Sequence, residues 1–302
     1  WVALTEAQQQ VSLAERNLQT YHTTASEVRA RYERGIRSPL DVRLALANEA
    51  SARAALADRR TALERARRQL DILRGLHPRG GSSPAAALPE APGEVPAGLP
   101  SELLTRRPDV AQAERRLAAA QSRTKQARAA RFPRLALTGS GGTTTAELSD
   151  LLNQDFSVWS IGANVAAPIL DGGRRRASVR QAEARAREAQ ALYGAAILNA
   201  FREVENGLAA EALQREREAQ VVQAWDHARA AAVLAEDRYR SGLEDIITLL
   251  ESQRRSAEAE SLALAVRRQR LENRIHLHLA LGGGFNRKSE AASLIHKQEQ
   301  TP

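Results

Sequence analysis

Residues 31–35 read RYERG, and residues 238–242 read RYRSG. A long run of helix-forming residues lies on each side of both glycines. Glycine is the usual residue for the left-handed turn that ends a helix, so each motif predicts a turn between two helices. The sequence therefore predicts two antiparallel helical hairpins, and these hairpins decide the fold.

The two hairpins share one ungapped plan. The turn glycines Gly35 and Gly242 lie 207 residues apart (242 − 35), and the closing glycines Gly75 and Gly282 keep the same offset (282 − 75). A constant offset over about 45 residues marks an internal repeat, and repeats decide architecture. The second copy also carries a preceding helix and a β-hairpin. Symmetry therefore predicts an equivalent helix and hairpin before Trp1.

The first copy is predicted as an incomplete repeat over residues 1–76. Its first helix stops at Gly35, and its second begins at Ser38 and Pro39 and runs to about Leu73. Serine is a favoured helix cap, and proline is favoured at the first helical position. Residues 77–107 are predicted to be a linker, because proline, glycine, serine and alanine dominate most of it.

The second copy is predicted over residues 108–285. It begins with a helix that Pro133 stops, at about Phe132, and continues with a β-hairpin over about 134–170. A long helical hairpin follows over 174–282, whose first helix would be on the order of 100 Å long. The polar tail, residues 286–302, is predicted to be disordered.

The β-hairpin alternates apolar residues with small or polar ones, which is the period of a strand. A lone two-stranded hairpin is barely stable in water, so these strands need partners. A closed membrane barrel would supply them, with the apolar face toward lipid and Trp159 in the interfacial aromatic belt. A soluble sheet packed on a helix is the alternative. The predicted lipid-facing residues are Leu135, Leu137, Trp159, Ile161 and Val165.

Composition agrees with long helices. Aromatic residues make up only 4% and methionine is absent, which suits thin helix–helix seams better than a thick globular core. The net charge is +8, but acidic and basic residues alternate along the helices, as on solvated helix faces, so we expect no nucleic-acid partner. The sequence has no cysteine for a disulfide or metal site, and no apolar stretch of about 20 residues. Lacking a catalytic or metal-ligating pattern, it indicates a non-enzymatic protein without cofactors.

Several short motifs carry a family resemblance. They read RRPDV at 106–110, AERRL at 113–117, RFP at 131–133, PILDGG at 168–173, AFREVE at 200–205 and ALGGGF at 280–285. With the two tip motifs, their order and spacing resemble those of TolC-type outer-membrane efflux proteins. Within that family the sequence is most similar to NodT-type lipoproteins of resistance–nodulation–division (RND) pumps. The resemblance covers essentially residues 1–285.

The resemblance implies a homotrimer in the outer membrane and periplasm of a Gram-negative bacterium. Each subunit would give four strands to a 12-stranded barrel surrounded by outer-membrane lipid, and the helices would form an α-barrel across the periplasm. Drugs and other small molecules would pass outward passively, with an inner-membrane RND-type pump and a periplasmic adaptor (membrane fusion) protein as partners. Because Trp1 falls inside a predicted helix, we expect a preceding segment that holds the signal peptide and any lipidated cysteine.

The resemblance also implies site residues. In the family, a tyrosine at the second tip bonds an acidic residue six positions after the first tip glycine, which predicts a bond between Tyr239 and Asp41. In the family, rings of acidic residues line the constriction, and Glu251 occupies the corresponding position in this sequence. Thr248 and Glu244 depart from residues that some relatives carry there, so the gate need not use the full set of links. The predicted gate is Asp41, Tyr239, Thr248 and Glu251, and the predicted adaptor-docking tips are Arg31, Tyr32, Gly35, Arg238, Tyr239 and Gly242.

One other functional class competes with the channel. A periplasmic coiled-coil adaptor or structural scaffold would also be made of helical hairpins, but it has no use for strands with an apolar face around Trp159. Asp41 and Glu251 are, on residue pattern alone, also compatible with ordinary solvated helix positions.

Overall fold

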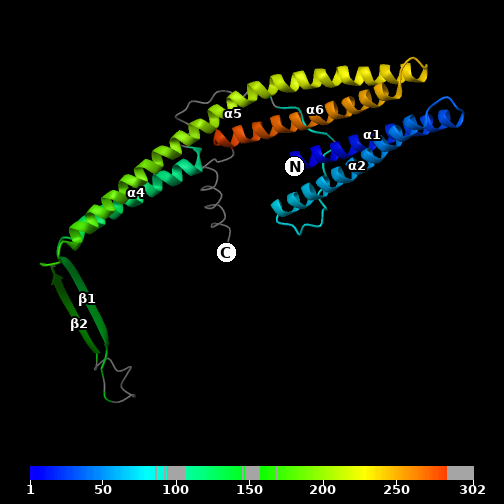
Figure 1. Cartoon of the computed structure of the whole chain (residues 1–302). Coiled ribbons are helices and arrows are strands. Elements are labelled where there is room, and N and C mark those ends of the chain that lie inside the picture. Colours follow the sequence, from blue (N-terminus) through cyan, green and yellow to red (C-terminus); the bar gives the residue numbers. More distant parts are fainter. Residues whose placement is uncertain are drawn as a thin grey trace. The chain divides into compact units, whose positions relative to one another are not determined.

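The structure is a computed structural model, and it describes residues 1–85, 87–91, 93, 106–144, 146, 157–167 and 169–283. The chain forms two compact units (Figure 1). Unit 1 comprises Trp1–Ala97 and Glu203–Leu281, and unit 2 comprises Gly98–Arg202 and Gly282–Pro302. The predicted fold class, mainly helical with one β-hairpin, is confirmed. These units do not coincide with the predicted domains, because one long helix runs through both units. The predicted domain division stays a prediction.

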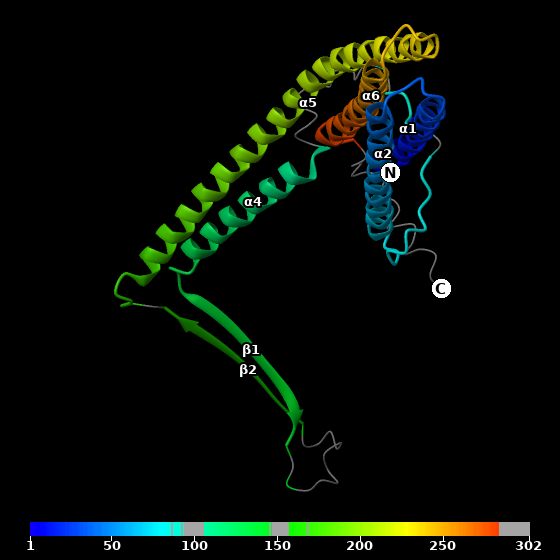
Figure 2. The same ribbon diagram turned by 45° about the vertical axis from the view of Figure 1, so that its right-hand side comes forward.

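Unit 1 contains the two helical hairpins. Helices α1 (Val2–Glu33) and α2 (Pro39–Leu73) form the first, and the later part of α5 (Arg174–Arg240) forms the second with α6 (Ile246–Ala280). Helix α1 packs along α2 and also contacts α6 (Figures 1 and 2). One apolar cluster lies toward the hairpin turns around Tyr239. A second joins α1 to α2 through Leu4, Ala7, Val11, Leu56 and Leu63.

Both hairpins turn in the same way, at the predicted positions. Gly35 and Gly242 adopt positive φ angles of 73° and 76°, which a residue with a Cβ rarely adopts. The next helix is capped by Ser38 in the first copy and by Asp245 in the second, again 207 residues on (245 − 38). Each cap side chain accepts a hydrogen bond from a backbone N–H in the first helical turn, which satisfies a group that has no partner within the helix.

A partly buried ionic cluster joins α5 to α6. Arg270 donates to Glu218 at 2.8 Å and to Glu211 at 3.2 Å, and all three side chains are at most one-fifth exposed. These two carboxylates, Glu218 first, raise the pKa of the Arg270 guanidinium. A charged cluster that must be paired in this way favours one register of the two helices over others.

Asp71 fixes the start of the predicted linker. Its side chain is buried, and it accepts hydrogen bonds from the backbone N–H of Gly80 at 2.8 Å, that of Gly81 at 3.3 Å and the hydroxyl of Ser82 at 2.5 Å. Arg74 also donates to the Ser82 hydroxyl. This part of the linker is therefore tied to the end of α2. Residues 94–105 of the predicted linker and the predicted tail lie outside the described residues.

Unit 2 holds α4 (Pro108–Ala129), the strands β1 (Arg134–Thr143) and β2 (Ser157–Ala166), and the first part of α5. Helix α4 runs alongside α5 (Figures 1 and 2), where the hydroxyl of Thr124 donates to the carbonyl of Ala182 at 3.2 Å. Helix α4 ends three residues before the predicted end at Phe132. The residue before a proline avoids helical angles, so Pro133 unwinds the last turn.

The two strands pair antiparallel and in register, from Arg134 opposite Ala166 to Thr143 opposite Ser157. Leu135 faces Val165, and Trp159 faces Gly141. On the other face, the hydroxyls of Ser140 and Ser160 lie 2.9 Å apart. Within the described residues, no helix has a stretch both long and apolar enough to span a membrane.

Candidate functional site at the hairpin tips

The turns of the two hairpins come together in unit 1 around Tyr239. This side chain is fully buried, and Tyr21, Val28 and Ala45 from the first hairpin belong to the same apolar cluster. Helix α6 adds further members, among them Leu249. The predicted gate residue Tyr239 is thus a packing centre through which the two tips hold each other.

Two arginines of the first tip cover the Tyr239 ring. The guanidinium carbons of Arg31 and Arg37 lie 5.0 and 4.7 Å from the ring centroid, within cation–π range. Arg31 also donates to the carbonyls of Tyr239 at 3.2 Å and Arg240 at 3.3 Å. These carbonyls end α5 and have no partners within the helix, so Arg31 joins the first tip to the end of the second hairpin's first helix.

The Tyr239 hydroxyl forms no hydrogen bond within the described part of the chain. Burial raises the pKa of this phenol, and the nearby Arg37 and Arg31 act against the rise. Asp41 instead closes a capping box, in which its carboxylate accepts the Ser38 N–H at 3.2 Å. The bond predicted between Asp41 and Tyr239 is thus absent from this single chain and stays a prediction for an assembled protein.

The other two predicted gate residues lie on α6. The backbone N–H of Thr248 donates to the cap carboxylate of Asp245 at 2.7 Å. Glu251 pairs with Arg255 at 2.7 Å and Arg254 at 2.8 Å, and these hydrogen bonds lower the pKa of its carboxyl group. Glu251 therefore keeps a negative charge on the helix surface at neutral pH.

Of the predicted docking residues, Tyr239 is buried and Arg31 is half-buried, and the other four are exposed at the two tips. Tyr32 is 43% exposed, and a Cβ added at Gly35 or Gly242 would meet no atom within 4 Å. Arg238 pairs with Glu244 at 3.3 Å. The structure thus places the four exposed residues at two turns that Arg31 holds together.

Exposed apolar residues follow each turn glycine, and they were not among the predicted site residues. Ile36 is 63% exposed in the first tip and Leu243 is 68% exposed in the second. Leu40 and Ile247 repeat this arrangement one turn later. Each pair is separated by the repeat offset of 207 residues (243 − 36 and 247 − 40), which was the signal available in the sequence.

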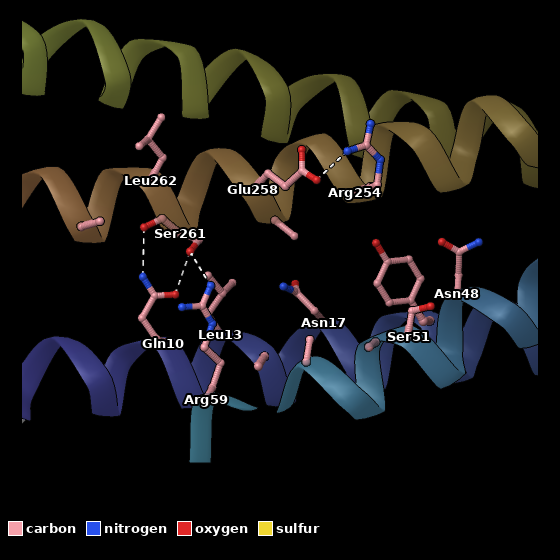
Figure 3. A pocket seen from close by; sticks show the side chains of 16 residues that line it. Gln10, Leu13, Asn17, Asn48, Ser51, Arg59, Arg254, Glu258, Ser261 and Leu262 are labelled. Carbon is pink, nitrogen blue, oxygen red and sulfur yellow. Dashed lines mark hydrogen bonds and ion pairs between the residues drawn. The ribbon is translucent and has the colours of Figure 1, made fainter. Parts of the chain in front are cut away.

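A groove of about 580 Å³ lies between α1, α2 and α6. Figure 3 shows Gln10 of α1 facing Ser261 of α6, where the Gln10 amide donates to the Ser261 carbonyl at 3.0 Å and accepts from its hydroxyl at 2.8 Å. Arg59 of α2 donates to the same hydroxyl at 3.2 Å. The lining combines amides, hydroxyls and apolar groups with the charged side chains Arg59, Arg254 and Glu258. Within the described residues no acidic or histidine cluster is placed to hold a metal ion.

Comparison with known proteins identifies similar chains. The family model described as outer membrane efflux protein matches residues 99–283. The solvent efflux pump outer membrane protein SrpC of Pseudomonas putida is 34% identical over 283 residues, which are 91% of this chain and 59% of SrpC. The outer membrane protein OprJ of Pseudomonas aeruginosa is 40% identical over 223 residues, which are 72% of this chain and 46% of OprJ.

The fold is also similar to solved structures. The open state of the MtrE outer membrane channel of Neisseria gonorrhoeae superposes with a TM-score of 0.81 at 32% identity. The match covers 95% of this chain and 65% of that one. The present chain therefore spans about half to two thirds of the length of the proteins that it matches.

Proposed function

This chain belongs to the outer membrane efflux protein family, and from that premise we propose that it forms part of a passive channel for the export of small molecules. The channel would be a homotrimer that crosses the periplasm and the outer membrane of a Gram-negative bacterium. A periplasmic adaptor and an inner-membrane RND-type pump would be its partners. The names of the matched relatives, which are efflux pump outer membrane proteins, support this assignment.

The β-hairpin carries the proposal. One face of the two-stranded sheet is apolar and largely exposed to solvent. Its members are 71–78% exposed, namely Leu135, Leu137, Trp159 and Ile161. Exposed apolar faces of this kind mark contact with a membrane or another protein. A closed barrel pairs every strand edge and turns such a face toward lipid, while the face with Ser140 would line the lumen. Three subunits with four strands each would supply the 12 strands that the family resemblance implies.

The hairpin tips would form the periplasmic entrance. We assign the gate to Asp41, Tyr239, Thr248 and Glu251, and adaptor docking to the two exposed turns that contain Gly35 and Gly242. The packing of Arg31 and Arg37 on Tyr239 supports a gate here, because any motion that separates the tips must disrupt these contacts.

Single-channel conductance tests the gate. Replacing Asp41→Ala or Tyr239→Phe in the gene product that contains this chain should increase the open probability in lipid bilayers, since each removes one partner of the proposed closed-state bond. Asp58→Ala is the matched control, because Asp58 is exposed in the middle of α2. The gate assignment would be wrong if both variants conducted like the parent and the control.

Electron microscopy of single particles tests the architecture. The gene product that contains this chain, purified in detergent, should form threefold tubes with a helical section on the order of 100 Å. Solid rods, or dimers without a lumen, would favour a coiled-coil scaffold and would overturn the channel.

A further inference from the structure

Exposed apolar side chains gather where unit 2 changes from helix to strand. Phe132, just before β1, is 69% exposed, and Ile169 and Leu170, just after β2, are 91% and 96% exposed. Figures 1 and 2 show both chain segments at the junction between the α4–α5 pair and the β-hairpin. Apolar groups so fully exposed are costly in water and indicate a contact surface.

Four arginines lie among these apolar residues. Arg131, Arg134, Arg174 and Arg176 are all exposed, and we call them the arginine belt. Within the described residues, none of the four forms an ion pair or a side-chain hydrogen bond.

The nearby acidic groups are already engaged. The carboxylate of Asp171 accepts the backbone N–H of Gly173 at 3.0 Å and that of Arg175 at 3.2 Å, and it pairs with the Arg175 side chain. Glu183 pairs with Arg128 at 2.7 Å. The arginine belt therefore carries an uncompensated positive charge.

One hydrogen bond joins the two chain segments that carry the arginine belt. The Arg175 guanidinium, at the start of α5, donates to the carbonyl of Ala130, at the end of α4. The segment that carries Arg131 and Arg134 thus lies beside the segment that carries Arg174 and Arg176, although about 40 residues separate the two in sequence. The belt is a single surface that two chain segments build together.

We propose that the arginine belt binds the phosphates of anionic phospholipids, while Phe132, Ile169 and Leu170 enter the acyl boundary. The proposal rests on the proposed function, which puts the β-hairpin in a membrane and this junction at the leaflet nearest the helices. Guanidinium groups bind phosphate with two parallel hydrogen bonds, and apolar side chains beside them suit the headgroup–acyl boundary. A free anion would use the arginines but would leave the three apolar side chains in water.

Lipid titration tests the belt. The gene product that contains this chain, in neutral detergent, is titrated with phosphatidylglycerol or phosphatidylcholine, and bound lipid is counted by native mass spectrometry. The parent should prefer phosphatidylglycerol. Each arginine near an anionic surface contributes about fivefold, so replacing all four belt arginines by glutamine should weaken that preference at least about tenfold.

A control with the same change in net charge is available in unit 2. Arg115, Arg116, Arg185 and Arg187 are exposed on α4 and α5, more than two helical turns from the junction. Replacing these four by glutamine should leave the lipid preference unchanged. The proposal is overturned if the belt variant keeps the preference, if the control loses it equally, or if millimolar inorganic phosphate displaces the lipid.

Conductance of the parent separates this proposal from the channel itself. A parent that conducts in bilayers but binds both lipids equally would overturn the belt alone. A parent that prefers phosphatidylglycerol but never conducts would support the belt and overturn the proposed channel.

Discussion

Asp71 shows how one carboxylate can organise a segment that has little packing of its own. The hydroxyl of Ser82, followed by the N–H groups of Gly80 and Gly81, holds the pKa of this carboxyl below its ordinary value, against the effect of burial. A carboxyl with a lower pKa in the folded chain stabilises the fold above its unfolded-state pKa of about 3.9. That stabilisation is lost as the pH falls through the lower, folded-state pKa.

Replacing Asp71→Asn should therefore lower the unfolding temperature at pH 7 and expose residues 77–85 to proteolysis. The difference from the parent should shrink as the pH falls below about 4, because the parent then loses its own carboxylate. Thermal unfolding followed by circular dichroism at several pH values measures this. Asp58→Asn, at an exposed site on the same helix, is the control and should match the parent throughout. Equal unfolding temperatures for the Asp71 variant and the parent at pH 7 would contradict the role of Asp71.

Removing the Tyr239 hydroxyl should change stability in opposite directions in the single chain and in the assembled channel. A buried hydroxyl without a partner costs about 1–3 kcal/mol, so Tyr239→Phe should raise the free energy of unfolding of the single chain by about 1 kcal/mol. In an assembled channel where the hydroxyl bonds Asp41, the same change should destabilise the closed state. Urea unfolding of the single chain measures the first effect. Tyr32→Phe, at a half-exposed ring, should change it by less than about 0.5 kcal/mol. A less stable Tyr239→Phe chain would mean that the hydroxyl already has a partner.

At the scale of elements, the two hairpins require the same backbone conformation at their turn glycines. Gly35 and Gly242 have positive φ angles and open space around the Cβ position, so alanine there meets backbone strain alone. Gly35→Ala and Gly242→Ala should each lower the free energy of unfolding by about 1–2 kcal/mol. Gly194, inside α5 and equally uncrowded, is the internal control, where alanine should stabilise by about 0.5–1 kcal/mol. Urea unfolding that gave the same sign at all three sites would contradict this explanation.

The elements themselves could be predicted because their ends carry strong local signals. The range predicted for α2 agrees with the structure because Ser38 and Pro39 form an unambiguous helix start. The strands could be found from alternation alone, because one face carries Leu137 and Trp159 and the other is small or polar. The packing of the two hairpins against each other could not be predicted from such local signals. It depends on α1 contacting α6, and helical periodicity does not specify which partner a helix face meets.

The candidate site was predictable in position but not in its contacts. The tip motif and the family resemblance both point to Tyr239. Neither indicates that Arg37, which lies outside the repeated motif, covers its ring at 4.7 Å. Nor does the sequence show that Asp41 is occupied by a capping box, because local hydrogen bonds compete with the longer-range partner that the resemblance implies.

At the scale of the whole molecule, the helical hairpins and the β-hairpin are stabilised in different ways. The hairpins of unit 1 bury apolar clusters within the chain. The β-hairpin buries almost nothing, since every described residue of β1 and β2 except Thr143 is exposed. A sheet with such strands gains its stability only from neighbouring strands and from lipid, so assembly and membrane insertion should be one event for this part of the protein.

Adjacent residues of β1 make that idea testable, because successive side chains point to opposite faces of a sheet. Leu137 lies on the apolar face, and the hydroxyl of Thr138 donates across the other face to the carbonyl of Gly162 at 3.3 Å. An arginine facing lipid near the midplane costs about 2–4 kcal/mol, whereas an arginine facing a wet lumen is hydrated. Leu137→Arg should therefore reduce the amount of the gene product recovered in the outer-membrane fraction.

Thr138→Arg should insert normally and shift the reversal potential in a salt gradient toward anion preference, because it adds positive charge to the lumen. Membrane fractionation and bilayer recordings measure the two effects on variants that differ by one position and carry the same new side chain. Equal loss of both variants from the membrane would mean that the two faces of the hairpin are not divided between lipid and lumen. The barrel would then have to be abandoned, even with the helical fold intact.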